Sequence, residues 1–298
     1  EMTPEQLQKC APCTGLWDTI ETGCFCRYDG DPETCEGPND YKQFLNTKKI
    51  VYGAYGKSVA KDSINPILFP FQKDLTYWSL KKGRCAIFAD TGLGKTFMQL
   101  EWARLIGENT LIVAPLSVAR QTANEGKKIN VTVNYARSQE QVKPGITITN
   151  YEMIEHFDPS FFVAVVLDES SILKSIDGKT KSKLIEMFAA TPFKLCCTAT
   201  PAPNDIAELA NHAEFLGIMN RTDMLATFFV HDEKGWRLRG HAKDPFYRWL
   251  ASWGMSIKRP SDLGYDDTRY ILPELTITPI FVQSDYSPSD QLFFTGLK

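Results

Sequence analysis

The sequence predicts an α/β fold in which helices cover both faces of a parallel sheet. The 298 residues are 43% apolar and 23% charged, an ordinary composition for a globular protein with a sizeable core. The first apolar run leads into a glycine-rich turn and then an amphipathic segment. Short apolar runs that alternate with helical patterns are typical of buried parallel strands. The five runs that we expect to be strands are residues 85–89, 110–114, 147–150, 163–168 and 194–198.

The chain divides into four regions. Residues 1–40 are rich in cysteine, glycine and aspartate, and they hold too few apolar residues for a core without a metal or disulfides. Residues 41–66 form a connector, and residues 67–218 carry the strand and helix patterns. Residues 219–298 are aromatic and basic, and we expect a helical insertion there with no strand before residues 275–282.

Charge is distributed unevenly, although the net charge is only −3. Residues 1–40 carry nine acidic and two basic residues, whereas residues 234–260 carry seven Lys or Arg and one Asp. The basic segment, unlike the bulk charge, suggests a nucleic-acid partner. No apolar run approaches the roughly 18 residues of a membrane span, and no secretion signal is visible. We therefore expect a soluble, cytoplasmic protein.

The glycine-rich turn reads ADTGLGKT and spans residues 89–96. Glycines let the backbone approach phosphate oxygens, and the amides at a helix start favour anions. Lys95 is expected to reach the β- and γ-phosphates of a nucleotide, and the Thr96 hydroxyl to bind Mg²⁺. The predicted phosphate loop consists of Thr91, Gly92, Leu93, Gly94, Lys95 and Thr96.

Two acidic residues, Asp168 and Glu169, end a strongly β-branched apolar run. The carboxyl end of a buried strand is where α/β proteins place ligand chemistry. We expect Asp168 to bind the Mg²⁺ and Glu169 to polarise the attacking water. A solvated strand end is the alternative for an isolated Asp-Glu pair, but the position 73 residues after Lys95 favours a catalytic pair.

Six motifs in this order resemble the first RecA-like lobe of a superfamily-two helicase. They read LFPFQKDL, ADTGLGKT, LIVAPLSVARQ, ITITNYEMI, VVLDESS and CCTATPAPND. More specifically, they resemble the Swi/Snf-type DNA translocases of phage and prophage genomes, over residues 67–218. DESS replaces the DEAD or DEAH of other branches, which weakens an RNA-helicase assignment. The resemblance implies a RecA-like fold that binds ATP, Mg²⁺ and DNA.

The resemblance also implies roles for residues outside the nucleotide motifs. Gln72 matches the glutamine that reads adenine, and Phe69 or Phe71 would either stack on the base or belong to the core. Thr198 and Thr200 match the motif that couples hydrolysis to movement on DNA.

Two further motifs resemble loops that hold one DNA strand by its phosphates. They supply Ser117, Asn150 and Tyr151, whose contacts would position the strand without reading its sequence. A simple strand-end turn is the alternative for Asn150 and Tyr151.

The basic segment at residues 234–260 combines cations with aromatic side chains. Four apolar residues stand at helical spacing and are expected in a core: Phe246, Trp249, Leu250 and Trp253. The cations are then the candidates for DNA contact, first Arg237, Arg239 and Lys243, and also Arg248, Lys258 and Arg259.

Five of the eight cysteines fall within residues 1–40, namely Cys10, Cys13, Cys24, Cys26 and Cys35. Four of them would make a closed tetrahedral Zn²⁺ site, and the sequence does not identify the fifth. Disulfides, free thiols and an iron–sulfur cluster are the alternatives. The acidic surroundings disfavour phosphate, so we expect a structural role or a protein partner here. The other three, Cys85, Cys196 and Cys197, are expected to be buried apolar residues.

Together these features favour an ATP-dependent DNA translocase or helicase, represented by its first motor lobe. A strand-separating helicase acting on DNA or RNA is one alternative, and a non-enzymatic ATP-responsive switch is another. In this family the second lobe carries the arginine that stabilises charge on the γ-phosphate. We therefore expect these residues alone to turn ATP over slowly. The expected setting is a bacterium or a phage-infected host cell.

Overall fold

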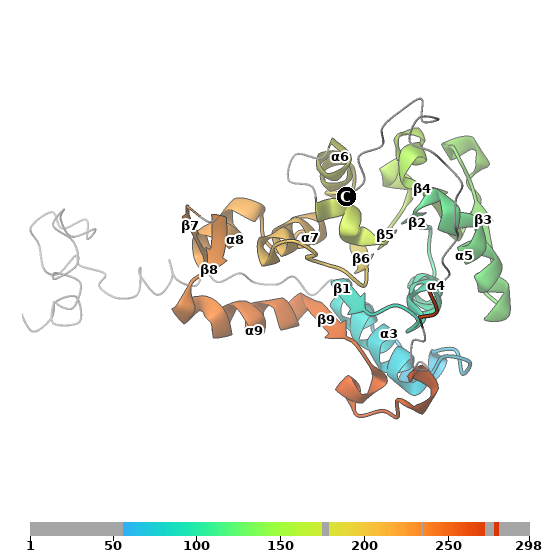
Figure 1. The fold of residues 1–298 in the computed structure, drawn as a ribbon. Helices are drawn as coiled ribbons and strands as arrows, with labels where there is room; N and C mark the ends of the chain where they lie inside the picture. The colour runs from blue at the N-terminus through green and yellow to red at the C-terminus, as the bar shows by residue number, and fades with distance from the viewer. Residues whose placement is uncertain (1–55, 175–178, 234, 272–276, 280–298) are drawn as a thin grey trace, which may run out of the picture. The chain divides into compact units, whose positions relative to one another are not determined.

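The computed structural model describes residues 56–174, 179–233, 235–271 and 277–279. All of them lie in one compact unit, Gly56–Lys298 (Figure 1). Its centre is a seven-stranded parallel sheet with the order β3-β4-β2-β5-β6-β1-β9. The predicted parallel α/β fold is therefore confirmed. The strands are β1 (Arg84–Ala89), β2 (Thr110–Ala114), β3 (Val133–Tyr135), β4 (Ile146–Asn150), β5 (Ala164–Asp168), β6 (Phe193–Cys197) and β9 (Gly254–Ile257).

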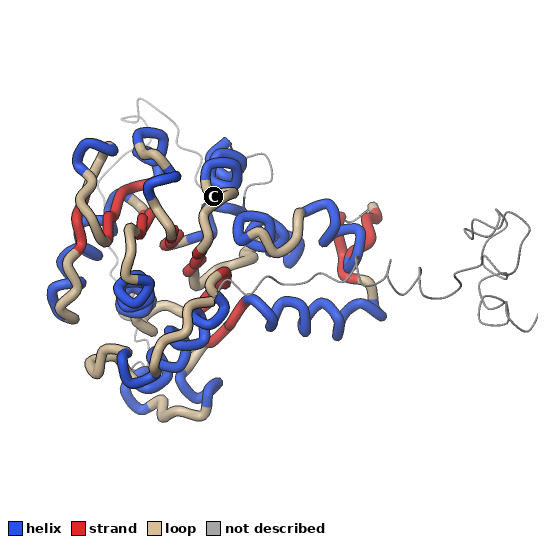
Figure 2. The backbone as a smooth tube through the Cα atoms, turned by 180° about the vertical axis from the view of Figure 1, so that it is seen from behind, coloured by secondary structure: helices blue, strands red, loops and turns tan. Residues whose placement is uncertain are grey.

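Helices cover both faces of this sheet (Figure 2). One face packs against α3 (Pro70–Lys82), α4 (Lys95–Ile106) and α5 (Leu116–Lys128). The other face packs against α6 (Lys179–Met187) and α7 (Leu209–Leu216). Because side chains alternate along a strand, β1 serves both cores: Cys85 and Ile87 belong to the first, Ala86 and Phe88 to the second.

The five strands expected from the sequence are all present, with bounds within one residue of the prediction. Two strands of the sheet, β3 and β9, were not predicted. The expectation that no strand precedes residues 275–282 is wrong, because the segment after residue 218 forms β9 and the antiparallel pair β7 (Phe229–Asp232) and β8 (Gly235–Leu238). Each of these has only four residues, and β9 is ordered by pairing with β1 rather than by a β-branched run of its own.

An extension that we call the arm follows α7. It consists of α8 (Arg221–Phe228), β7, β8 and α9 (Lys243–Trp253), and Figure 1 shows it reaching away from the sheet. The predicted aromatic core is confirmed, because Phe246, Trp249 and Trp253 are buried. Their rings pack on one another and on Phe228 and Phe229, with centroids 5.2–5.7 Å apart. Leu250 packs partly buried against the same core.

Candidate nucleotide site at the carboxyl edge of the sheet

The glycine-rich turn joins β1 to α4, so the predicted strand–loop–helix arrangement is present. Gly92 and Gly94 adopt φ angles of 81° and 77°, a region that favours glycine. A Cβ on Gly94 would also lie 2.4 Å from Gln72 Nε2. Thr91 and Gly92 are exposed, whereas Leu93 is buried. The loop thus presents its backbone, and the unpaired first amides of a helix favour an anion there.

Lys95 is the first residue of α4 and folds back over the turn. Its Nζ donates hydrogen bonds to the main-chain oxygens of Ala89 at 3.0 Å and Asp90 at 3.3 Å. A charged phosphate is a stronger acceptor than a carbonyl, so the amine can exchange these bonds for a nucleotide. Thr96 follows in the same turn and is half-buried.

Asp168 ends β5 and faces α4. Gln99, which the sequence did not single out, donates a 2.7 Å hydrogen bond from Nε2 to Asp168 Oδ1, and both side chains are buried. Burial raises the pKa of Asp168, and the hydrogen bond from Gln99 opposes that shift. Gln99 stands four residues after Lys95, one helical turn further along the same face. A polar residue at that spacing is the sequence signal that could have identified it.

Glu169 has a φ of 49°, an uncommon conformation for a residue with a side chain. Thr198 Oγ1 donates to Glu169 Oε2 at 3.3 Å, and the amide of Thr200 donates to Thr198 Oγ1 at 3.1 Å. The structure therefore brings the predicted coupling threonines to the carboxylate that is predicted to polarise water. β5, β6 and β1 are neighbours in the sheet, which places these groups beside the phosphate loop.

Gln72 lies in the first turn of α3 and is buried against the loop. Its Nε2 donates to the Leu93 carbonyl and its Oε1 accepts from the Phe69 amide, both at 2.9 Å. A primary amide has two N–H donors and two acceptor lone pairs. One N–H donor and one acceptor lone pair of Gln72 are therefore left. The Watson–Crick or the Hoogsteen edge of adenine would bond to this donor and acceptor.

The two phenylalanines beside Gln72 differ in exposure. Phe71 is 2% exposed and belongs to the core, whereas Phe69 is 38% exposed. The Arg269 guanidinium lies 5.6 Å from the centroid of the Phe69 ring, and the Tyr270 ring packs edge-on to both phenylalanines. Of the two candidates, Phe69 is thus the one whose face a base could reach.

The predicted DNA-holding residues lie at the ends of neighbouring strands β2 and β4. Ser117 is exposed in the first turn of α5. Asn150 is 2% exposed, and its Nδ2 donates to Glu152. Tyr151 is 7% exposed, and its hydroxyl donates to the Asp168 main-chain oxygen at 2.7 Å. The Tyr151 hydroxyl is therefore engaged inside the protein rather than presented to a ligand.

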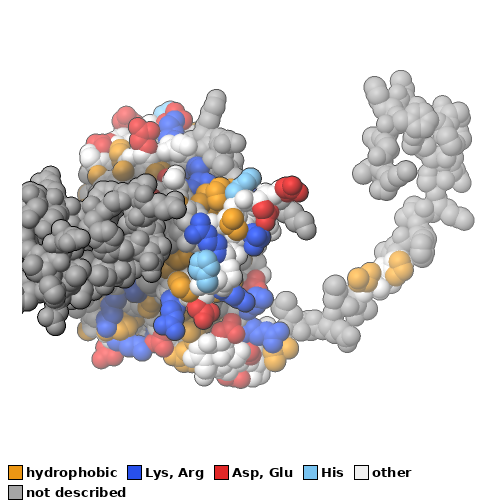
Figure 3. Space-filling model, turned by 90° about the vertical axis from the view of Figure 1, so that its left-hand side faces the viewer, with side chains coloured by type: hydrophobic (Ala, Val, Ile, Leu, Met, Phe, Trp, Pro, Cys, Tyr) orange, Lys and Arg blue, Asp and Glu red, His pale blue; other side chains and the backbone are white. Residues whose placement is uncertain are grey.

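The predicted basic contacts lie on the arm, away from the nucleotide motifs. Arg237 is exposed and forms an ion pair with Asp232 across the β7–β8 pair. Arg239 is half-buried, and Lys243 is exposed at the start of α9. Figure 3 looks onto this side of the molecule and shows Lys and Arg side chains gathered there.

The zinc prediction and its five cysteines lie outside the described residues. Within the part of the chain that the structure describes, no group of three His, Cys, Asp or Glu residues could hold a metal ion. The other three cysteines, Cys85, Cys196 and Cys197, are buried free thiols, as predicted. No helix among the described residues is long and apolar enough to cross a membrane.

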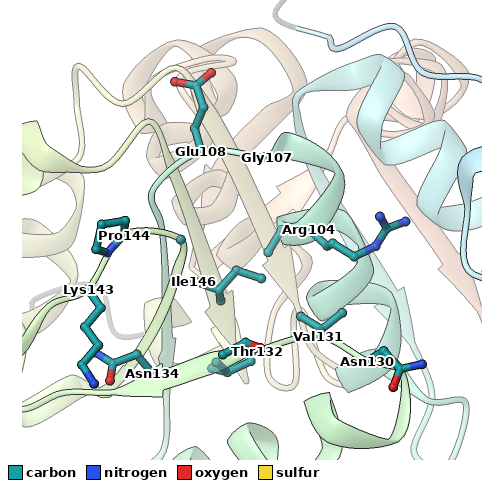
Figure 4. Close-up of a pocket in the computed structure, with 13 residues that line it drawn as sticks. Arg104, Gly107, Glu108, Asn130, Val131, Thr132, Asn134, Lys143, Pro144 and Ile146 are labelled. Atoms are coloured by element: carbon teal, nitrogen blue, oxygen red, sulfur yellow. The ribbon is translucent and has the colours of Figure 1, made fainter.

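A hollow of about 540 Å³ lies at the opposite, amino-terminal edge of the sheet (Figure 4). It is lined by the end of α4, the turn before β3 and the turn before β4, with Arg104, Glu108 and Lys143 as its charged residues. It contains none of the predicted site residues.

Neither a family model nor a curated protein matches the sequence. Among solved structures, the chain is similar to the SWI2/SNF2 ATPase core of Sulfolobus solfataricus in complex with double-stranded DNA. The TM-score is 0.59 at 18% identity, over 71% of this chain and 48% of that one. A second structure, the Sulfolobus solfataricus SWI2/SNF2 ATPase core domain, gives a TM-score of 0.56 at 19% identity, over 73% of this chain and 50% of that one. The likeness shows that this chain shares the α/β fold of that ATPase core. The chain spans about half the length of either structure.

The residues present fit a nucleotide with its metal. A Cβ would clash at Gly94, the Lys95 amine rests on exchangeable carbonyls, and a buried carboxylate is held toward α4. The Thr96 hydroxyl and Asp168 would hold Mg²⁺, which neutralises phosphate charge when bound.

Proposed function

We propose that this chain is the first motor lobe of an ATP-dependent DNA translocase of the Swi/Snf type, similar to those of phage and prophage genomes. The observation that carries the proposal is the contact between Thr198 and Glu169. A carboxylate that polarises water, held by the coupling motif, is an arrangement for hydrolysis rather than for nucleotide binding alone. The likeness to a double-stranded-DNA-bound ATPase core supports DNA as the track.

In this proposal each residue of the edge has one task. The loop amides and Lys95 bind the phosphates, and Gln72 with Phe69 holds the base. Glu169 accepts a hydrogen bond from the attacking water and orients it toward the γ-phosphate. Thr198 and Thr200 keep that carboxylate in place and sense its state.

The DNA side of the proposal uses the loops after β2 and β4 and the arm. Ser117 and Asn150 would contact one strand through its phosphates. Arg237, Arg239 and Lys243 would add sequence-independent charge contacts. Both sets lie outside the nucleotide site, so DNA and ATP can bind together.

Replacing Glu169 with Gln tests hydrolysis. We expect Glu169→Gln to bind ATP with unchanged affinity and to hydrolyse it at least about a hundredfold more slowly, because the general base is lost. Lys95→Ala should lose binding itself. Equilibrium binding of a fluorescent ATP analogue and single-turnover hydrolysis of radiolabelled ATP, each with and without duplex DNA, measure the two effects.

The matched control is Glu186→Gln, which removes an exposed carboxylate on α6 and should behave as the wild type. Hydrolysis by Glu169→Gln at the wild-type rate would contradict the proposal. Triplex displacement without strand displacement is the result expected of a translocase, and strand displacement would instead indicate a helicase.

A further inference from the structure

Tyr151 connects two parts of the molecule that the motifs treat separately. It is the first residue of the 3-10 helix η4 (Tyr151–His156), directly after β4. Its hydroxyl reaches the main-chain oxygen of Asp168 at the end of β5. In the sheet β2 lies between β4 and β5, so the Tyr151 side chain spans the end of β2. One buried hydrogen bond thus joins the predicted DNA-holding loop to the catalytic strand.

The bonded oxygen belongs to the peptide between Asp168 and Glu169. Glu169 follows this peptide with a φ of 49°, a strained conformation that persists only when its surroundings hold it. Tyr151 fixes one side of the peptide. On the next residue, Ser170 Oγ lies 3.1 Å from His212 Nε2, and both side chains are fully buried. The position of the Glu169 carboxylate therefore depends on both contacts.

The loop that carries Tyr151 also holds an unsatisfied polar atom. Asn150 Oδ1 is buried and has no hydrogen-bond partner among the described residues. Asn150 pairs with Ala114 at the end of β2, and Leu116, two residues further along, is 61% exposed, so the surface at these two strand ends is not fully packed. A buried amide oxygen without a donor is costly. The loop after β4 is therefore held by fewer hydrogen bonds than its side chains could make, which lowers the cost of changing its conformation when a DNA strand contacts it.

We propose that Tyr151 is a positioning residue that transmits DNA binding at the loop after β4 to the water-polarising carboxylate of Glu169. The proposal rests on the proposed function, since it assigns the route by which DNA stimulates that hydrolysis. When DNA moves the loop, the Tyr151 hydroxyl shifts the Asp168–Glu169 peptide and aligns Glu169.

Tyr151→Phe tests this link because it removes one hydroxyl and keeps the ring. In the whole chain we expect the DNA-stimulated single-turnover rate to fall about tenfold, the effect of one buried hydrogen bond. The rate without DNA should fall less than the DNA-stimulated rate, so that the stimulation ratio falls, and the ATP affinity and the DNA affinity should change less than about twofold. Ser170→Ala, which loosens the other side of the peptide, should lower both rates and preserve their ratio. Tyr135→Phe, on half-buried β3, is the matched control.

A second measurement does not depend on turnover. Amide hydrogen exchange at residues 168–174 should change when duplex DNA is added to the wild type, and not in Tyr151→Phe. A wild-type stimulation ratio in Tyr151→Phe, an equal fall of both rates, or the same exchange change in both proteins would overturn the proposal. Failure of the proposed function is seen separately, as Glu169→Gln hydrolysing ATP at the wild-type rate.

Discussion

Gln99 illustrates how a single polar side chain can set the chemistry of the site. It is fully buried in α4, and its Nε2 donates a 2.7 Å hydrogen bond to Asp168. The Gln99 Oε1 has no partner among the described residues, so the side chain is kept there at a cost. That cost is understandable if Gln99 holds Asp168 ionised. Burial raises the pKa of Asp168, and the Gln99 donor is the largest effect against it.

Gln99→Leu should therefore weaken Mg²⁺ binding in a pH-dependent way. Without the donor the pKa of Asp168 rises further, so the carboxylate is protonated earlier as the pH falls. We expect the Mg²⁺ concentration for half-maximal ATP binding to rise about tenfold at pH 6, and less at pH 8. Titration with MgCl₂ at both pH values measures this. Gln121→Leu, on the exposed side of α5, should have no effect, and a pH-independent loss in Gln99→Leu would contradict the explanation.

Among the elements, α7 has the most unusual composition for a buried helix. Seven of its eight residues are buried, including Asn211 and His212. Asn211 donates to the Leu173 main-chain oxygen at 2.7 Å, and His212 contacts Ser170, so α7 holds the segment η6 (Ser170–Lys174) that follows Asp168 and Glu169. The same helix leads into α8 and the arm. An element that the motifs do not include thus supports both the site and the extension.

The buried imidazole of α7 should make stability depend on pH. Burial lowers the pKa of His212 from 6.5 to about 4. The unfolded chain takes up the proton first, so this contribution is complete above about pH 6.5 and is lost as the pH falls toward 4, by about 3 kcal/mol in all. Urea unfolding between pH 4 and 7 should show a shallower decline for His212→Gln than for the wild type. His156→Gln, at an exposed histidine, should keep the wild-type slope.

Strand prediction succeeded where local sequence determines the strand. β1, β2, β4, β5 and β6 are fully or almost fully buried and rich in apolar or β-branched residues, so their pattern is visible without the fold. β9 is different: it begins at Gly254, where an added Cβ would lie 3.2 Å from the Phe88 ring. The place of β9 beside β1 is determined by that close approach and by strand pairing. The four residues of β9 alone reveal neither.

The candidate site could be proposed from the sequence to the extent that its residues belong to motifs. Lys95, Asp168 and Glu169 lie where the order of motifs places them. Gln99 could be assigned only from its spacing of four residues after Lys95, since its partner Asp168 is 69 residues away. His212 could not be assigned, because its partner Ser170 is 42 residues away and only folding brings the two together. Tyr151 was found, but as a DNA contact, since its sequence position shows the loop and not the direction of the side chain.

At the scale of the whole described unit, nucleotide groups and basic groups occupy different places. The nucleotide motifs line the carboxyl edge of β1, β5 and β6, whereas the arm carries its cations beyond α7. A shared aromatic core links them, because Trp253 of the arm packs against Phe88 of β1, 6.2 Å between centroids. Phe88 directly precedes the glycine-rich turn at residues 89–96. The arm is therefore packed onto the strand that leads into the predicted nucleotide site.

If the arm grips DNA, its cations should determine the salt dependence of binding. Each phosphate contact contributes about 0.9 to the slope of log affinity against log salt concentration. Replacing Arg237, Arg239 and Lys243 together with Gln should lower that slope by up to about 3 and weaken binding at low salt. We expect a change in slope nearer 2, because Arg237 already has a counter-charge in its ion pair with Asp232. Fluorescence anisotropy of a labelled duplex across a NaCl series measures the slope.

Replacing Lys127, Lys128 and Lys143 with Gln removes the same charge from other exposed positions. An equal loss of slope in that variant would assign the effect to net charge instead of the arm. ATP binding without DNA should be unchanged in both triple variants, since neither set reaches the phosphate loop.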